Sequence, residues 1–563
     1  MPDPATDAVT EVTEAVAPTE GEATLQAAIA GLPALGEGQL LVGAAKSSIA
    51  PRPEDMQEQF PGARWETDPN KCKVLDPVFL ERLASQTQTE LDHLVAAGSP
   101  WPENPSCIYQ GGFSIGPANP VSAYDAELGL WVRTLALGDG TDTMLLTVID
   151  GEGWLWDYAQ KCDDCGSKQI AAALAEELKP YGVTEKSFVL HATHSHASPD
   201  FIGGWGFVPD WYMAQVTETI KQTARNAVAA MEPAVVEVGE VEARAHNGER
   251  RDTYRSAEEQ QLGWLRAIAV DQEAPATEPA ATEPTTSEPA GNGKGKKPSP
   301  SPSPSPSEPP AADEPRVIAT LGAYAAHPTT KGTNGGVAHP DWPGVFEKKV
   351  EDRFGGIGLH FMTGLGNMSA SGGTDIGNRL GNALPPVGAG RLLTDTDLVL
   401  EQTTWSHPVT NAPLDALGTP GFFDRQFDPA PATVQTGKSP DTAPCTSAAP
   451  QSVELPVTAA RIGKALYLTT GPGELFSNVT NTLKERRPGA VVLPLAQSND
   501  ALGYMPQSFE LNPVGQQGLG FAFGGYVFVN YEDSYAVDRC IGDKVLEETI
   551  ALMGAVDAPP APQ

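Results

Sequence analysis

Two hydrophobic patterns alternate along the chain, and together they predict strands mixed with amphipathic helices. Short continuous apolar segments are typical of buried strands, whereas apolar residues spaced three and four apart are typical of helices. This mixture predicts an α+β fold: one large mixed α/β domain in which stacked β-sheets are flanked by helices. Strands are expected at 130–137, 144–149, 188–190, 235–241, 358–361, 466–470 and 491–495, and helices at 168–178, 211–231, 475–487 and 545–553.

A Pro/Ser-rich tract at 272–315 interrupts this pattern, and its composition predicts a disordered segment with no core of its own. It is flanked by two strand-like runs, 262–270 and 316–325, which suit a hairpin with an inserted tip better than a linker between domains. Long surface insertions of this kind cost little entropy. We therefore expect a single domain over 38–563, preceded by a disordered acidic tail at 1–37.

The charge and hydropathy of the chain exclude several classes of partner. A net charge of −35 disfavours nucleic acid or an anionic membrane surface as an electrostatic partner. No apolar run reaches 18 residues, so no transmembrane segment is expected. The first residues lack the basic and apolar regions of a signal peptide, so no signal peptide is visible in this sequence.

Six cysteines, an even number, are compatible with disulfides. Cys162 and Cys165 have C-x-x-C spacing, but a structural zinc site would need a second such pair, which the sequence lacks. A local disulfide and a pair of free thiols both remain open for these two residues.

Three of the nine histidines fall within six positions, directly after the strand-like run at 188–190. Crowded imidazoles need partners for both ring nitrogens, and they repel one another if they are protonated. A divalent metal removes both problems because it binds the lone pairs of neutral imidazoles. The three residues, His191, His194 and His196, are therefore candidates for a metal site, and the alternative is a polar turn that binds nothing.

Four further residues carry candidate chemistry, each with a structural alternative. His327 ends a strand before a proline, and Glu474 lies near the start of a helix, where a carboxylate is favoured without any ligand. Ser369 lies in a small-residue loop that could surround an oxyanion or be an ordinary flexible loop. Tyr504 follows a glycine-bearing turn that could point its phenol inward.

The order of these motifs resembles the catalytic domain of the neutral/alkaline (non-lysosomal) ceramidase family. The resemblance spans about residues 38–550, and the family's motifs occur here in the family's order. Residues 193–199 match the family pattern Thr-His-Thr-His-Ser-Gly-Pro, residues 327–329 match His-Pro-Thr, and residues 366–369 match Gly-Asp-Val-Ser. Residues 472–474 match Pro-Gly-Glu, residues 499–504 match Asn-Asp/Glu-x-x-Gly-Tyr, and residues 531–533 match Tyr-Glu-Gly.

The resemblance implies a zinc ion, Zn2+, held by two histidines, a glutamate and a tyrosine. Carried over to this sequence, these ligands are His194, His327, Glu474 and Tyr504. A catalytic zinc keeps one position open for water and lowers the pKa of that water to about 7.

The same resemblance assigns catalytic roles to Ser369 and His196, the latter as a neighbour of the metal or a group that polarises the substrate. The family's substrate-binding arginine corresponds to Arg250 or Arg251, of which we select Arg251, and Tyr531 is a second expected substrate contact. Whether Ser369 attacks the substrate or positions the water is left open.

The implied function is that of a zinc-dependent amidohydrolase, which cleaves the N-acyl amide bond of a ceramide-like lipid or a related amide with metal-activated water. Such an enzyme would be extracellular or on the cell surface and would meet its lipid substrate at a membrane surface. The chain departs from the family at Ala197, Ser198 and Asn367, and we expect no counterpart of the family's C-terminal β-sandwich. Other amides or esters therefore remain candidate substrates.

Two rival functions remain open. One is a non-catalytic binding protein, secreted or on the cell surface, that retains the ceramidase fold. The other is a metal-dependent phosphoesterase, which is disfavoured because the sequence motifs lack the extra aspartate ligands of a two-metal centre.

Overall fold

The computed structural model describes residues 35–72, 106–112, 119–159, 161–203, 208–251, 257–270, 315–411, 414, 424–425, 427–511 and 531–558. Residues 1–34 of the expected N-terminal tail and 272–314 of the expected Pro/Ser insertion lie outside the described residues.

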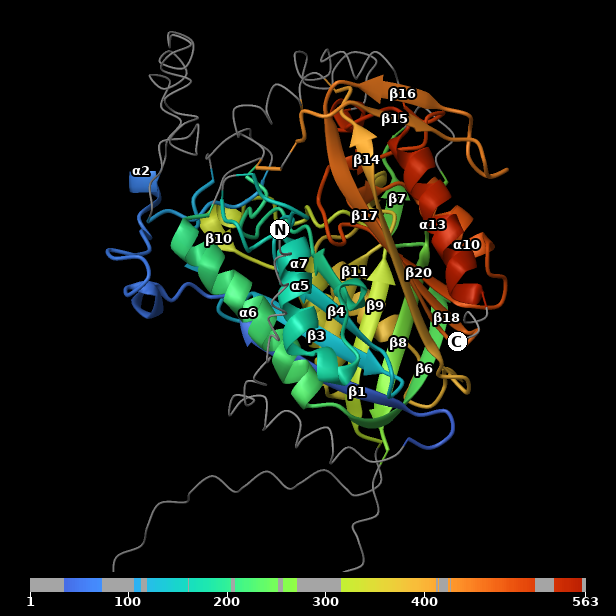
Figure 1. The fold of residues 1–563 in the computed structure, drawn as a ribbon. Helices are drawn as coiled ribbons and strands as arrows, with labels where there is room; N and C mark the ends of the chain where they lie inside the picture. The colour runs from blue at the N-terminus through green and yellow to red at the C-terminus, as the bar shows by residue number, and fades with distance from the viewer. Residues whose placement is uncertain are drawn as a thin grey trace, which may run out of the picture.

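A large mixed sheet forms the centre of the molecule, with strand order β11-β9-β8-β6-β1-β3-β4-β5, and β13 pairs with β6 outside this path (Figure 1). The adjacent antiparallel strands β3 and β4 confirm the two strands expected at 130–137 and 144–149. β5 then pairs with β4 in parallel. The strands are β1 (Leu40–Ser48), β3 (Trp131–Gly138), β4 (Thr143–Ile149), β5 (Phe188–Ala192), β6 (Glu232–Glu242), β8 (Gln261–Ala269), β9 (Val317–Tyr324), β11 (Ile357–Met362) and β13 (Arg391–Leu392).

The two strands that flank the Pro/Ser tract are neighbours in this sheet. β8 and β9 pair antiparallel, with Gly263 opposite Ala323 and Leu265 opposite Leu321. This pairing confirms the hairpin expected of the flanking segments, and it places His327 three residues after the end of β9.

A second sheet packs against the first and consists of β14 (Leu398–Pro408), β17 (Ser452–Ile462), β18 (Leu466–Thr470) and β20 (Val491–Leu495). Alternate residues of the central strands face it and form a buried apolar layer with its inner face. Leu135 and Leu321 of the first sheet and Leu468 of the second belong to this layer. The stacking follows from the two-residue period of strands, which gives each sheet an apolar inner face.

Helices cover the outer faces of the two sheets (Figure 1). Apolar residues of α5 and α6 pack on the side of the first sheet that faces away from the second. The outer side of the second sheet packs against α10 and α13. The stacked sheets flanked by helices confirm the expected α+β class. The helices are α5 (Ser167–Glu177), α6 (Asp210–Ala229), α7 (Asp341–Phe354), α8 (Asp375–Ala383), α10 (Ser477–Glu485) and α13 (Ile541–Asp557).

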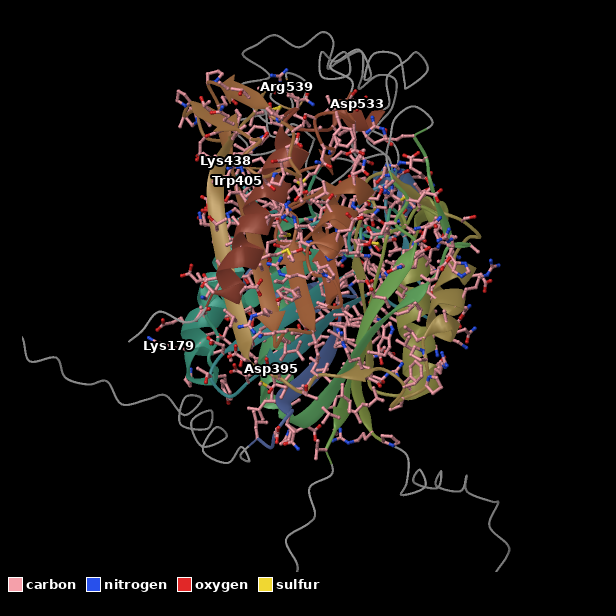
Figure 2. The ribbon with its side chains drawn as sticks, turned by 90° about the vertical axis from the view of Figure 1, so that its right-hand side faces the viewer. Lys179, Asp395, Trp405, Lys438, Asp533 and Arg539 are labelled. Atoms are coloured by element: carbon pink, nitrogen blue, oxygen red, sulfur yellow. A yellow bond between two sulfur atoms is a disulfide. The ribbon has the colours of Figure 1, made fainter. Side chains whose placement is uncertain are left out.

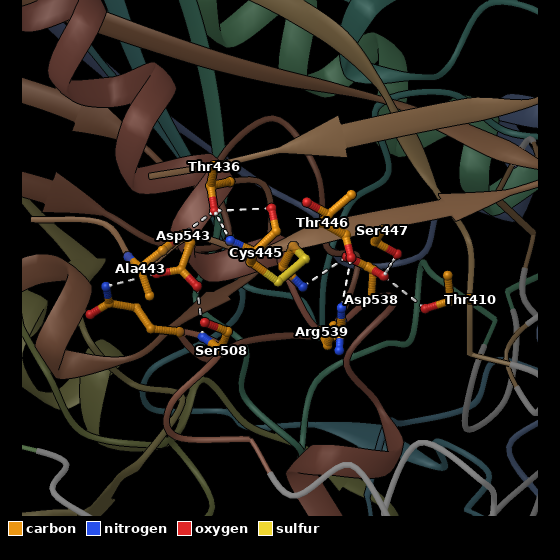
Figure 3. Close-up of a disulfide and its surroundings, with 12 residues drawn as sticks. Thr410, Thr436, Ala443, Cys445, Thr446, Ser447, Ser508, Asp538, Arg539 and Asp543 are labelled. Carbon is orange, nitrogen blue, oxygen red and sulfur yellow. Dashed lines mark hydrogen bonds between the residues drawn. A yellow bond between two sulfur atoms is a disulfide. The ribbon is translucent and has the colours of Figure 1, made fainter. Parts of the chain in front are cut away.

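All six cysteines are paired, as Cys72–Cys107, Cys162–Cys165 and Cys445–Cys540. The local disulfide is thus the alternative that the structure adopts for the C-x-x-C pair. Cys445–Cys540 joins the residue before β16 (Thr446–Ala449) to the residue before α13 (Figure 3). Trp405, on the long strand β14 (Figure 2), packs against this disulfide.

No helix among the described residues is long and apolar enough to cross a membrane.

Candidate metal centre

Loops that follow strands of the large sheet bring the candidate residues together. β4 and β5 run parallel, so the segments that follow them, with Glu152 after β4 and His194 after β5, leave the sheet at the same edge. His194 adopts a left-handed backbone conformation with φ of 57°, which is uncommon for a residue other than glycine. Such local strain persists where the surroundings hold it, and it is frequent at functional sites.

Three buried imidazoles form the core of the site. The rings of His194, His196 and His327 are 4.9–5.3 Å apart between centroids, and one ring nitrogen from each lies within 4.8 Å of the others. Each Nδ1 contacts a main-chain carbonyl oxygen, which can only accept, so each Nδ1 carries the proton. Each Nε2 consequently presents a lone pair. The acceptors are Glu152 O for His194 (2.6 Å), Gly112 O for His196 (2.8 Å) and Leu365 O for His327 (3.2 Å).

Burial keeps these imidazoles neutral. It lowers the pKa of His194 to about 4 and the pKa values of His196 and His327 well below the ordinary histidine value. Neutral imidazoles with fixed tautomers are the form in which histidine binds metals. The cluster thus fits a divalent cation and is a poor anion site.

Glu474 brings a carboxylate to the same space. Its Oε1 lies 3.7 Å from Nε2 of His194, and its Oε2 lies 3.7 Å from Nδ1 of His327. Burial raises the pKa of Glu474 to about 8, although Arg250 and a hydrogen bond from Tyr504 act in the opposite direction. A buried carboxyl whose pKa is raised and which faces the Nε2 lone pair of His194 is a strong candidate for a cation ligand.

Tyr504 adjoins Glu474 through a short ladder. β19 (Glu474–Leu475) and β21 (Tyr504–Met505) pair in parallel, with Glu474 directly opposite Tyr504. The phenol ring is stacked on His327 with centroids 6.5 Å apart, and its hydroxyl accepts a hydrogen bond from Nη2 of Arg250 at 3.1 Å. The structure therefore brings together His194, His196, His327, Glu474 and Tyr504.

Ser369 lies beside the cluster on a short strand, β12 (Met368–Ala370). It forms a parallel bridge with His327, whose amide donates to Met368 O at 2.9 Å. The preceding Asn367 is fully buried, and its Oδ1 accepts a hydrogen bond from the amide of Ser477 at 2.8 Å, at the start of α10. Asn367 therefore ties this loop to a helix.

The two adjacent arginines point in different directions. Arg251 is buried and pairs with Asp533, 2.8 Å away, so its guanidinium is engaged with a carboxylate outside the histidine cluster. Arg250 is the arginine that donates to Tyr504 and also to Gly366 O. Tyr531 begins α12 (Tyr531–Ser534), and its side chain lies outside the described part of the structure.

Glu152 is a site residue that the sequence reasoning missed. Its side chain is fully buried, and Oε1 lies 3.4 Å from Nε2 of His196. The signal that could have found it is its position just after β4, the parallel neighbour of the strand that leads into the histidines. Polar residues after adjacent parallel strands meet at one edge of a sheet.

Comparisons with known proteins agree with this architecture at the level of the fold. No protein-family model matches the chain, and no curated protein matches its sequence. Among solved structures, the crystal structure of neutral ceramidase from Pseudomonas aeruginosa is similar, with a TM-score of 0.55 and 13% identity, covering 93% of this chain and 76% of that one. A structure described as ceramidase complexed with C2 is also similar, with a TM-score of 0.54, 12% identity, and 94% and 77% coverage. The chain therefore has the fold of neutral ceramidase.

Proposed function

We propose that this protein is a zinc-dependent amidohydrolase that cleaves an N-acyl amide bond of a ceramide-like lipid or a related amide. The observation that carries the proposal is the cluster of three buried imidazoles, each of which offers one ring nitrogen within 4.8 Å of the other two, beside the carboxylate of Glu474. The fold shared with neutral ceramidase structures supports the hydrolase class and the amide substrate.

The residues that would hold the zinc ion are His194, His327, Glu474 and Tyr504. Imidazole nitrogen, carboxylate oxygen and phenol oxygen form a donor set that suits zinc. A bound zinc ion would activate water for attack and polarise the substrate carbonyl. The main-chain carbonyls of Glu152 and Leu365 orient the two histidines by holding their Nδ1 protons.

The remaining residues have roles that follow from their positions. His196 presents a lone pair at Nε2 and can accept a proton there, for later transfer to the leaving amine. Ser369, which is backbone-paired with His327, is proposed to place its hydroxyl against the reacting carbonyl. Arg250 holds the Tyr504 hydroxyl in place and is proposed as a substrate contact alongside Arg251 and Tyr531.

An extracellular or cell-surface location suits this activity. Three disulfides in a single chain persist best in an oxidising compartment. A lipid substrate would also be met at a membrane surface, at which the negative net charge provides no electrostatic attraction to anionic lipids.

The test is a hydrolysis screen of acyl-chain amides, including ceramides, with zinc-loaded and chelator-treated protein. We expect turnover that the chelator abolishes and zinc restores, together with loss of bound zinc and turnover in His194→Ala. The matched control is His246→Ala, because His246 lies outside the cluster and should leave zinc content unchanged.

Two results would contradict the proposal. If the purified protein takes up no zinc, the metal assignment is wrong. If it binds zinc stoichiometrically but turns over no amide, the alternative of a binding protein with this fold is preferred.

A further inference from the structure

The disulfide between Cys162 and Cys165 is more accessible than the other two. Cys162 is partly exposed, and both cysteines line a pocket of about 750 Å³. The other four cysteines are buried, and the most exposed of them, Cys445, has only 7% of its surface accessible. Thiol–disulfide exchange requires a thiolate to reach a disulfide sulfur, and exposed disulfides are the labile ones. Cys162 is therefore the sulfur at which exchange can begin in the folded protein.

The pocket beside this disulfide has room for a small thiol. It is lined by Ser47 and Ser48 at the end of β1 and by Met213 and Ala214 of α6. Pockets of about 300–1,000 Å³ are of the size that binds small molecules. A thiol that enters this pocket comes to lie against the sulfur of Cys162.

The position of Cys165 stabilises the thiolate that exchange would release. Cys165 directly precedes Gly166, the N-cap of α5, and no acidic residue occupies the first turn of that helix. The positive end of a helix stabilises a neighbouring thiolate, and a stabilised thiolate is a better leaving group. Asp163 and Asp164, between the two cysteines, are exposed, so solvent screens the repulsion that they exert on an incoming thiolate.

The segment that ends in this disulfide begins at the candidate metal centre. The main-chain carbonyl of Glu152 accepts the hydrogen bond from Nδ1 of His194. Two residues further on, Nε1 of Trp154 donates to the carbonyl oxygen of Cys165 at 2.8 Å. The turn closed by the disulfide is thus bonded to the residues that follow Glu152, and opening it loosens their support.

The same segment also contacts the residues that precede Tyr504. Oγ of Ser167 donates to Asn499 O, and the amide of Trp156 donates to Oδ1 of Asp500 at 3.1 Å. The disulfide therefore restrains a segment that is bonded to two parts of the centre, one at His194 and one just before Tyr504.

We propose that Cys162–Cys165 is a thiol–disulfide exchange site, at which small thiols open the disulfide and thereby weaken the binding of zinc. A thiolate attacks Sγ of Cys162 to form a mixed disulfide, and the electron pair of the broken S–S bond leaves on Sγ of Cys165. A second thiolate attacks the sulfur of the attached thiol and releases Cys162 as a thiolate. Two thiols are thus oxidised to one disulfide, and the protons that they lose are taken up by the two cysteines. The effect on zinc rests on the proposed function, whereas the exchange itself does not.

Differential alkylation tests where exchange occurs. The folded protein is incubated with reduced glutathione, quenched in acid and alkylated, and peptide mass spectrometry then identifies the modified cysteines. We expect the glutathione adduct on Cys162 and the alkyl group on Cys165, with the other four cysteines reacting at least about tenfold more slowly. All six should react in urea, where the fold no longer protects them.

A substitution that narrows the pocket tests the route of entry. Ala214→Phe should slow the reaction of Cys162 several-fold. The matched control is Ala229→Phe, at the exposed end of the same helix, which should leave the rate unchanged. Equal rates in the two variants would overturn the pocket as the route. If either of the other disulfides reacts as fast as Cys162–Cys165, or if no cysteine of the folded protein reacts, the exchange site is wrong.

The effect on zinc is measured without thiols, because thiols bind zinc themselves. Cys162→Ser combined with Cys165→Ser mimics the opened disulfide, and its zinc affinity, measured by competition with a chelator, should fall about tenfold. Asp163→Asn alters the same turn but keeps the disulfide, so its zinc affinity should be unchanged.

The outcomes separate this inference from the proposed function. Unchanged zinc affinity in the double serine variant would overturn the link between the disulfide and the centre. Absence of exchange, with zinc binding and amide hydrolysis retained, would overturn the inference and leave the hydrolase intact. If the unaltered protein binds no zinc, the proposed function and the effect on zinc are both wrong, and the alkylation pattern alone decides the exchange site.

Discussion

The hydroxyl of Tyr504 lies between the carboxylate of Glu474 and the guanidinium of Arg250. It hydrogen-bonds to Glu474 and accepts from Nη2 of Arg250 at 3.1 Å. Because Glu474 and Tyr504 are directly opposite in a parallel ladder, the backbone itself sets their spacing. The carboxylate is thus held by a neighbouring strand, which preorganises it toward the histidines.

Tyr504→Phe should weaken the centre without unfolding the protein. The substitution removes one oxygen and leaves the ring stacked on His327. We expect zinc affinity and amide hydrolysis to fall at least about 10–100-fold, the loss typical of removing a group that only orients a metal ligand, because Tyr504 is itself a proposed ligand. Competition with a chelator of known affinity measures the first quantity, and initial rates measure the second.

Tyr467→Phe is the control for that prediction. It also removes a phenol hydroxyl, which donates to Asp557 at 2.6 Å at the end of α13, and neither residue belongs to the candidate metal centre. Unchanged zinc affinity is expected, and equal losses in both variants would show that the effect of Tyr504→Phe is not specific to the centre.

Exchanging each adjacent arginine for lysine should separate stability from hydrolysis. Arg251→Lys loses part of a buried network with Asp533 and Glu510 O, so we expect the free energy of unfolding to fall by about 1–3 kcal/mol. Arg250→Lys keeps a positive charge near Glu532 but loses the planar donor pair that reaches Tyr504 and Gly366 O. The rate of amide hydrolysis by the Arg250→Lys variant should fall about tenfold or more.

Chemical denaturation and initial rates, measured on the same preparations, distinguish the two effects. If Arg251→Lys abolishes hydrolysis at unchanged stability, Arg251 is the substrate contact, as the sequence predicts, and Arg250 has the structural role.

His191 should make the protein less stable in acid. Its Nδ1 donates to Ala496 O at 2.8 Å and its Nε2 accepts from the amide of Met362 at 3.0 Å, and burial lowers its pKa to about 3. The unfolded chain binds a proton below about pH 6.5 and the folded protein does not, so stability falls as the pH drops below 6.5. Between pH 7 and pH 5 this one group should cost about 2 kcal/mol.

His191→Gln can retain both hydrogen bonds and does not titrate, so its stability loss between these pH values should be smaller by about that amount. Urea denaturation at pH 7 and pH 5 measures the difference. His246→Gln, at a partly exposed position, is the control. Between pH 7 and pH 5 it should lose nearly as much stability as the unaltered protein loses. An equal loss in the unaltered protein and in His191→Gln would rule out this histidine as a source of the acid sensitivity.

Two of the disulfides should contribute unequally to stability. Cys445 and Cys540 are 95 residues apart, whereas Cys162 and Cys165 are three apart. In the chain-entropy relation, a loop of about 100 residues is worth about 4.7 kcal/mol and a loop of about four residues about 2 kcal/mol. The double alanine variant of the first pair should therefore be less stable in urea than that of the second. The reverse order would contradict the entropic account.

Much of the secondary structure was predictable from the sequence because it depends on local patterns. Continuous apolar runs produced β3, β4, β18 and β20, and each lies within about one residue of the expected range. The hairpin of β8 and β9 was predictable for the same reason, since two apolar strands on either side of a Pro/Ser-rich tract have few other partners.

The sequence by itself also singled out His194, His327, Glu474 and Tyr504, which its motifs mark and the fold brings together. Only the tertiary structure decided how they act, because hydrogen-bond direction depends on residues that are distant in the chain. The carbonyl of Leu365 orients His327, and that of Gly112 turns the lone pair of His196 toward Glu152. Likewise, which of Arg250 and Arg251 meets Tyr504 depends on strand pairing and on where Asp533 lies. No periodicity along the chain encodes such contacts, which arise when segments from several strand ends meet at one edge of a sheet.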